Sequence, residues 1–237
     1  MELSLDKEVL EKYPNAVIGY LVAKVVMKPS DPYVESLKGS LLTYLEALSI
    51  NATNFAIHSS MSIWREIYEK DFQVKPKTYR SSLEALLRRV ITGIEMWKIC
   101  NVVDLYNCCS ILSLLPMGGY DLKKVQGDIK IRFGKVGETF VALGAKEKIP
   151  VQSNHVVYAD DERVMCWLWN HKDSRDTCID EESEYVIFFM DAFDLESINK
   201  GLQLLKENLE KIESSVLEIG ILNKEASIVE VKSFAVV

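Results

Sequence analysis

Cysteine and histidine are scarce in this sequence, and their spacing excludes the common metal-binding motifs. The 237 residues include only five cysteines and three histidines. The cysteines are Cys100, Cys108, Cys109, Cys166 and Cys178. They contain no C-x-x-C pair, and no histidine stands at metal-ligand spacing from a cysteine, so a structural zinc site is not expected. We therefore predict a protein with neither a bound metal nor a cofactor.

The sequence also lacks an apolar run long enough to span a bilayer. Its first residues are Met-Glu-Leu-Ser-Leu-Asp-Lys-Glu. They are charged, and they lack the basic start and the apolar centre of a signal peptide. We expect a cytoplasmic protein without a membrane partner.

Basic residues are outnumbered, which argues against a general nucleic-acid coating protein. The chain has 28 Lys and Arg against 35 Asp and Glu, a formal net charge of −7. A coating protein would draw its affinity from neutralising phosphates. The distribution is nevertheless uneven, because residues 72–92 and 122–135 are basic whereas residues 176–196 contain acidic residues and no basic one. The candidate RNA-binding residues of the first basic segment are Lys75, Lys77, Arg80, Arg88 and Arg89.

Hydrophobic residues make up 48% of the chain, enough for a full core. Their spacing predicts strands at 16–26, 128–133, 155–158, 164–169, 185–190, 217–222 and 227–237, and helices at 33–48, 61–68, 81–93, 101–114 and 195–216. Helices dominate residues 1–121 and strands dominate residues 122–237. This segregation favours an α+β fold with mixed β-sheets flanked by helices, within a single domain covering residues 1–237.

Polar residues inside an apolar helix mark the centre of the sequence. Asp104 and Asn107 project from the same helix face, and the predicted helix ends in a Pro/Gly turn over residues 116–121. One interpretation is that the polar groups form hydrogen bonds that cross-link this turn. The other is that they support a binding pocket whose floor is the Gly118–Gly119 backbone, where glycine allows positive φ or the close approach of a ligand.

Ordered sequence blocks from about residue 17 to residue 222 resemble a known family. They include Val74-Lys-Pro-Lys, Asn101-Val-Val-Asp-Leu-Tyr-Asn107, Leu115-Pro-Met-Gly-Gly-Tyr-Asp121 and Val157-Tyr-Ala-Asp160, with Trp64-Arg-Glu before them and Trp169-Asn after them. The chain resembles the stand-alone B3/4-domain proteins, which are similar to the editing domain of the phenylalanyl-tRNA synthetase beta subunit. The resemblance implies a pocket for the 3′ end of tRNA or aminoacyl-tRNA, possible contact with a synthetase, and no DNA partner.

The resemblance also implies residue roles, and this sequence departs from some of them. Asp104 and Asn107 match the Val-Asp-x-x-Asn helix of the family. The bacterial synthetases have a histidine where this chain has Gly118. Their pocket glutamate falls near Phe188 or Phe189, and stand-alone relatives often carry Gly-Glu where this chain has Asn154-His155.

Three functions therefore remain open from the sequence. The first is hydrolysis of mischarged aminoacyl-tRNA in trans, with His155 as the predicted catalytic residue. The second is a non-catalytic module that binds tRNA, an amino acid or a protein partner, and the third is an interaction protein that docks through the acidic segment 176–196. The predicted pocket residues are Asp104, Asn107, Gly118, Gly119, Asn154, Asn170, His171 and Asp173.

Overall fold

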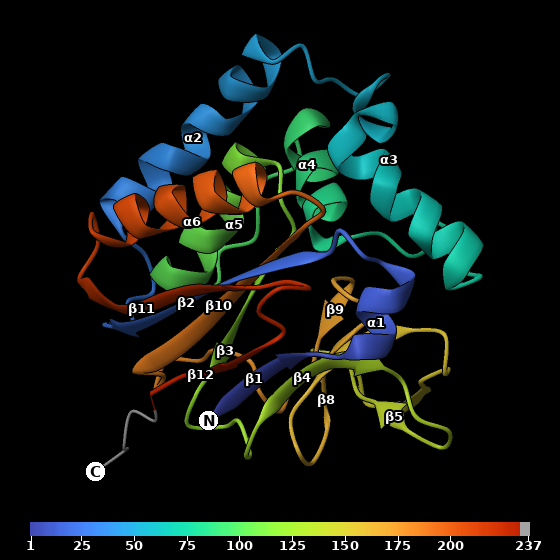
Figure 1. Cartoon of the computed structure of the whole chain (residues 1–237). Coiled ribbons are helices and arrows are strands. Elements are labelled where there is room, and N and C mark those ends of the chain that lie inside the picture. The colour runs from blue at the N-terminus through green and yellow to red at the C-terminus, as the bar shows by residue number, and fades with distance from the viewer. Residues whose placement is uncertain (233–237) are drawn as a thin grey trace.

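The computed structural model describes residues 1–232 and has two main β-sheets with helices packed against them (Figure 1). The six-stranded sheet has the order β12-β1-β4-β7-β8-β9. Its strands are β12 (Ile228–Glu230), β1 (Glu2–Leu5), β4 (Ile129–Phe133), β7 (Val156–Ala159), β8 (Val164–Trp167) and β9 (Lys172–Asp173). Only the β1–β4 pair is parallel, and all the other pairs are antiparallel. The sheet is therefore mixed, as predicted.

The four-stranded sheet has the order β11-β2-β10-β3 and is antiparallel throughout. Its strands are β11 (Ser214–Leu222), β2 (Val17–Val25), β10 (Tyr185–Ala192) and β3 (Met117–Asp121). A small third sheet joins β5 (Thr139–Phe140) to β6 (Ile149–Pro150). One hydrophobic cluster contains buried residues of both main sheets, so the two sheets share a core.

Most of the helices lie on one side of the four-stranded sheet, whereas the short helix at residues 7–12 packs against β4 of the six-stranded sheet (Figure 1). The helices are α1 (Lys7–Lys12), α2 (Pro32–Ala47), α3 (Ser59–Glu66), α4 (Ser82–Ile91), α5 (Asn101–Ser113) and α6 (Leu195–Leu209), with a 3₁₀ turn at Phe55–Ile57 and a π-helical turn at Ile67–Asp71. Ser81 caps the start of α4, because Glu84 N donates to Ser81 Oγ at 3.2 Å. The α+β class with mixed sheets flanked by helices is thus confirmed.

Two element predictions are wrong. Residues 116–121 form no Pro/Gly turn, because residues 117–121 are strand β3, which pairs with β10. The reversal comes earlier, at Leu114, whose φ of 56° ends α5 in the left-handed region. The predicted helix 195–216 stops at Leu209, since the chain turns there and enters β11.

The division into a helix-rich and a strand-rich half does not correspond to two separate bodies. Strand β1 from the N-terminal end lies between β4 and β12, and β3 pairs with β10, which lies far from it in the sequence. The boundary of a single domain at 1–237 stays a prediction. Of the strand predicted at 227–237, residues 228–230 are β12, and residues 233–237 lie outside the described residues.

Within residues 1–232, no helix combines the length and the apolar character needed to cross a bilayer. The same part of the chain contains no group of three or more His, Cys, Asp or Glu side chains arranged to hold a metal ion.

Candidate functional site

A cavity of about 450 Å³ opens between α4, α5, β3 and the loop of residues 92–100. Most of its lining is apolar: Ala85, Leu86, Trp97, Ile99, Val103, Tyr106, Met117, Gly119, Leu143 and Ile179. Its polar lining residues are Ser82, Asn107, His171, Asp173 and Cys178. An apolar cavity of this volume with a few convergent polar groups is typical of small-ligand sites. We call it the outer cavity.

A polar compartment adjoins the outer cavity at its inner end. Its volume is about 20 Å³, enough for about one water molecule. The two spaces share the lining residues Ser82, Met117, His171 and Asp173. The other polar or charged residues around this inner compartment are Tyr120, Tyr158, Cys166, Asn170, Lys172 and Asp191. A ligand in the outer cavity would therefore meet its polar partners at this end.

Asp191 lines the inner compartment and accepts three hydrogen bonds. Tyr158 Oη donates to Asp191 Oδ1, and Trp169 Nε1 donates to the same oxygen at 3.3 Å. Asn170 Nδ2 donates to Oδ2 at 3.1 Å. Burial nevertheless raises the pKa of Asp191 to about 7, because desolvation of the carboxylate outweighs these hydrogen bonds. Asp191 is therefore a buried carboxyl group that titrates near neutral pH.

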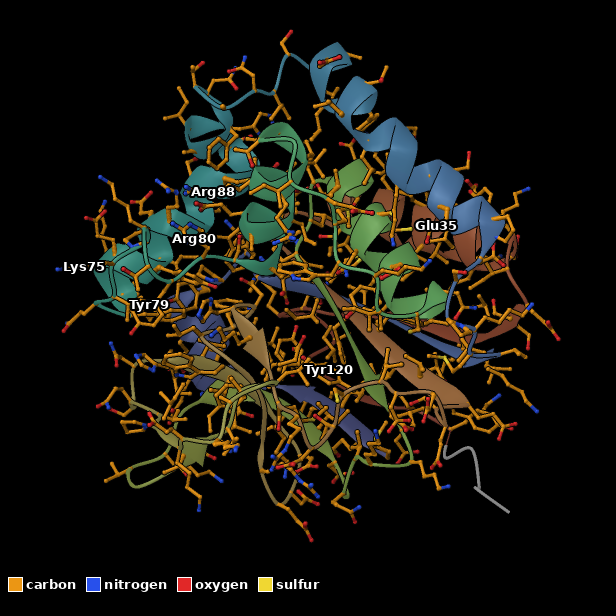
Figure 2. All side chains as sticks on the ribbon, turned by 180° about the vertical axis from the view of Figure 1, so that it is seen from behind. Glu35, Lys75, Tyr79, Arg80, Arg88 and Tyr120 are labelled. Atoms are coloured by element: carbon orange, nitrogen blue, oxygen red, sulfur yellow. The ribbon has the colours of Figure 1, made fainter. Side chains whose placement is uncertain are left out.

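Asp173 lies at the junction of the two spaces. Tyr120 Oη donates to its Oδ1 at 2.7 Å, from strand β3 in the interior of the molecule (Figure 2). Burial raises the pKa of Asp173 as well. Within residues 1–232 neither Asp173 nor Asp191 forms an ion pair. The inner end of the site thus holds two carboxyl groups that form no ion pair, although Lys172 also lines the compartment.

His171 has a fixed tautomer beside these carboxyl groups. Its Nδ1 lies 2.6 Å from the Arg80 carbonyl oxygen. Because a carbonyl can only accept, Nδ1 carries the proton and Nε2 is an acceptor. Burial lowers the pKa of His171 to about 4, so the ring is neutral at pH 7. Nε2 has no hydrogen-bond partner within residues 1–232, and it can accept from a water molecule or a ligand.

The hairpin that carries these residues is strained. Leu168 and Trp169 follow β8 with φ values of 55° and 64°, a region that bulky residues rarely adopt. Trp169 is fully buried and packs edge-on against Tyr13 and Trp64. This packing holds the hairpin in place and directs Asn170 to the inner compartment.

The structure brings together several of the residues singled out from the sequence. Asn107, Gly119, His171 and Asp173 line the outer cavity, and Gly118, Asn170, His171 and Asp173 line the inner compartment. Sequence patterns did not predict Ser82, Tyr120, Tyr158 or Asp191 as site residues. Only Asp191 had a local signal, since it directly follows the apolar run 185–190.

Three other residues lie outside both spaces. Asp104 accepts from Ile99 N at 3.1 Å and from Lys38 Nζ at 2.5 Å, so it holds the loop that forms one wall of the outer cavity. Asn154 donates to the Asp71 carbonyl at 2.8 Å. His155 is buried, and its Nδ1 accepts from Trp167 Nε1 at 3.1 Å. The catalytic role of His155 stays a prediction from the sequence.

The expectation of positive φ at Gly118 and Gly119 is wrong, because neither residue adopts it. The close approach of a ligand to their backbone stays a prediction. Gly119 faces Phe188 across the β3–β10 pair, and Gly118 faces Phe189. The need at Gly119 is for space, because the side chains around it already fill the position of a β-carbon.

Gly119→Ala is expected to lower the unfolding free energy by about 1–3 kcal/mol through overpacking. A β-carbon there would lie 2.9 Å from Ile179 Cδ1 and 3.2 Å from both Phe188 Cδ1 and Tyr106 Cε1. Gly118→Ala is the matched control, since its nearest contact would be Tyr120 Oη at 3.4 Å. Urea denaturation of both variants measures the difference, and equal losses would contradict the packing argument.

The predicted RNA-binding residues divide into two groups. Lys75, Lys77 and Arg88 are exposed, and none of their side chains has a hydrogen bond or ion pair within residues 1–232. Arg80 pairs with Glu84 at 3.6 Å, and Arg89 donates to the Glu95 carbonyl while it lies 4.1 Å from the Trp97 ring centroid. Lys75, Arg80 and Arg88 lie toward one side of the molecule (Figure 2).

The acidic segment 176–196 is not one continuous acidic face. Asp191 is buried in the inner compartment, and Asp194 caps α6 by accepting from Ser197 N at 2.7 Å. Asp180 is paired with Lys124 at 2.5 Å. Several acidic side chains of this segment are therefore not available to a docking partner.

Comparison with known proteins gives relatives of one kind. The chain is 32% identical over 81 residues to the phenylalanine–tRNA ligase beta subunit of Chromobacterium violaceum, which is 34% of this chain and 10% of that protein. It is 28% identical over 114 residues to the same subunit of Fusobacterium nucleatum, 48% of this chain and 14% of the relative. These matches span only a small part of the curated relatives.

A solved structure is also similar: an N-terminal fragment of the phenylalanyl-tRNA synthetase beta subunit from Pyrococcus horikoshii. The TM-score is 0.48 at 14% identity, and the match covers 90% of this chain and 49% of that one. The profile of the B3/4 domain matches residues 65–216, well over half of the chain. The chain belongs to the B3/4 domain family.

Proposed function

We propose that this protein binds the aminoacylated 3′ end of a tRNA in the outer cavity and hydrolyses the aminoacyl ester. The observation that carries the proposal is the neutral His171 ring at the junction of an apolar cavity and a water-sized polar compartment. The relatives are beta subunits of phenylalanine–tRNA ligase, which supports an aminoacyl-tRNA context. The same context supports a cytoplasmic location and contact with a synthetase.

The site supplies the groups that the reaction needs. The apolar walls around Leu86, Val103 and Ile179 accept the side chain of the amino acid. A water molecule at the inner end donates to His171 Nε2, which orients it toward the ester carbonyl carbon. The water oxygen bonds to that carbon, the ester C–O bond breaks, and the ribose oxygen leaves with a proton. The products are a free amino acid and an uncharged tRNA.

The tRNA backbone has a separate set of contacts in this proposal. Lys75, Lys77 and Arg88 have free charged ends within the described residues 1–232, and Arg80 and Arg89 are already engaged within the protein. Phosphate binding by three lysine or arginine side chains produces a binding constant that falls with salt. The exposed ring of Trp97 at the cavity mouth offers a surface on which a terminal base can stack.

A panel of mischarged tRNAs tests the proposal, with His171→Asn as the diagnostic variant. Asparagine keeps a donor for the Arg80 carbonyl but has no acceptor at the position of Nε2. We expect the wild type to deacylate at least one member of the panel, and the variant to be slower by about 100-fold or more. His58→Asn is the matched control, because His58 only caps α3 and asparagine is a good N-cap.

The alternative is a non-catalytic module that binds tRNA, an amino acid or a protein partner. Gly118 lies where the synthetases resembled carry a histidine, and their glutamate falls near Phe188 or Phe189, which face Gly119 and Gly118 across β3 and β10. The polar groups of those enzymes are therefore missing at adjacent positions of this sheet. Salt-dependent tRNA binding without deacylation of any member of the panel would favour this alternative over hydrolysis.

A further inference from the structure

Asp173 is placed to meet a positive charge from the ligand. It lines both the outer cavity and the inner compartment, and within residues 1–232 it forms no ion pair, although Lys172 also lines the inner compartment. A carboxylate withdrawn from water is costly unless a cation or enough donors compensate it. Tyr120 Oη is one donor, and the Cys166 thiol is a weak second one. A carboxylate has about four acceptor positions, so Asp173 retains acceptor capacity.

Asp191 is less suited to the same task. It lines the inner compartment but not the outer cavity. Three donors, from Tyr158, Trp169 and Asn170, already occupy its two oxygens. A ligand entering from the outer cavity therefore reaches Asp173 first.

A second unsatisfied group marks the same junction. Ser82 Oγ is buried, it has no hydrogen-bond partner within residues 1–232, and Ser82 lines both spaces. Buried polar atoms in folded proteins are nearly always hydrogen-bonded. A hydroxyl oxygen can accept from an ammonium group, as a carboxylate can. The junction thus offers one charged and one neutral acceptor that the described part of the protein leaves unused.

We propose that Asp173 and Ser82 Oγ bind the free α-ammonium group of the aminoacyl ligand, so that the site selects unblocked aminoacyl esters. This inference rests on the proposed function and names its substrate class. The ammonium group offers three donors, which suit Asp173, Ser82 Oγ and a water in the inner compartment. An ester whose α-nitrogen is absent or acylated would leave the Asp173 carboxylate without an ion-pair partner.

The test compares one amino acid with its α-hydroxy acid analogue on the same tRNA. The analogue has nearly the same size and shape, but a hydroxyl replaces the ammonium group. We expect kcat/KM for the analogue to be lower by about 30-fold or more. The ratio of kcat/KM for the aminoacyl ester to kcat/KM for the analogue is expected to fall toward one in Asp173→Asn, which keeps an acceptor for Tyr120 Oη. Asp176→Asn, an exposed change nearby, is expected to leave the ratio unchanged.

A binding measurement separates this inference from the proposed function. A non-hydrolysable amide-linked aminoacyl-adenosine and its α-hydroxy counterpart are titrated by calorimetry into the wild type and Asp173→Asn. Tighter binding of the amino compound by the wild type alone supports the inference even if no tRNA is deacylated. Equal rates and equal affinities for the two compounds would overturn the inference and leave the proposed hydrolysis standing.

Discussion

Alanine in place of His155 is expected to lower the unfolding free energy by about 3–5 kcal/mol. The ring is 4% exposed and packs against Phe72 and Trp167. Its Nδ1 accepts from Trp167 Nε1 at 3.1 Å and from Gln152 N at 3.3 Å, and it also bonds to the Phe72 backbone. The truncation would therefore create a cavity and leave the buried donor Trp167 Nε1 without an acceptor.

Urea denaturation and thermal unfolding measure this effect, with His58→Ala as the control at a less buried histidine. The same preparations are assayed for deacylation at a temperature where the variant is folded. We expect the folded variant to keep its activity, since His155 lines neither the outer cavity nor the inner compartment. A variant of normal stability without activity would instead support the catalytic role predicted from the sequence.

His155 illustrates what a single sequence can and cannot reveal about a site. The sequence placed it before a strand that borders the pocket in the resembled family, and the strand β7 does begin at Val156. The direction of the side chain was not encoded in that pattern. Burial against Phe72 depends on a segment far away in the sequence, and no local periodicity reports such a contact.

Elements defined by local chemistry were predicted well. The helices over residues 81–93 and 101–114 and the apolar strand 185–190 all depend on residues within one or two turns of each other. Strand β3 was missed because Gly118 and Gly119 have low strand propensity. Its pairing with β10 overrides that propensity, and the small residues there make room for Ile179 and Phe188.

The candidate site was predicted only in part, because local sequence patterns report only residues that are close together in the chain. Asn170, His171 and Asp173 lie close together in a single hairpin, so one polar cluster in the sequence indicated all three. Ser82, Tyr120 and Asp191 join them from α4, β3 and β10. Only the tertiary fold brings these segments together. Buried tyrosines and a carboxylate at a strand end look like ordinary core and surface residues until their partners are known.

Asp191 is expected to make the protein less stable as the pH rises. Its pKa is about 7 in the folded protein against 3.8 for an ordinary aspartate. Between these values the folded protein binds more protons than the unfolded chain, so the contribution of Asp191 to stability is fully present below about pH 4 and is lost as the pH rises through 7. The loss totals about 4 kcal/mol over the whole range, and about 2–3 kcal/mol of it falls between pH 5 and pH 8.

Asp191→Asn isolates this effect from the other titrating groups. His155 and His171 have lowered pKa values, so they act in the opposite direction: their stability is lost as the pH falls below about 6.5. Both histidines are present in the wild type and in the variant, so their pH-dependent contributions largely cancel in the difference between the two unfolding free energies. We therefore expect the stability of the wild type relative to the variant to fall by about 2–3 kcal/mol between pH 5 and pH 8, measured by urea denaturation.

Asp191→Asn also lowers the unfolding free energy by an amount that does not depend on pH, and this loss must be separated from the pH effect. The asparagine introduced by Asp191→Asn can still accept from Tyr158 and Trp169, but its amide nitrogen would face Asn170 Nδ2, a second donor. Asn170→Asp combined with Asp191→Asn restores an acceptor opposite that nitrogen, and the new carboxylate can also accept from Tyr68 Oη. The mismatch lowers the stability of Asp191→Asn at every pH. The double variant should recover this loss, because the hydrogen-bond mismatch is removed. If the wild type and Asp191→Asn curves run parallel from pH 5 to pH 8, Asp191 does not change protonation in this range, and its three donors outweigh its burial.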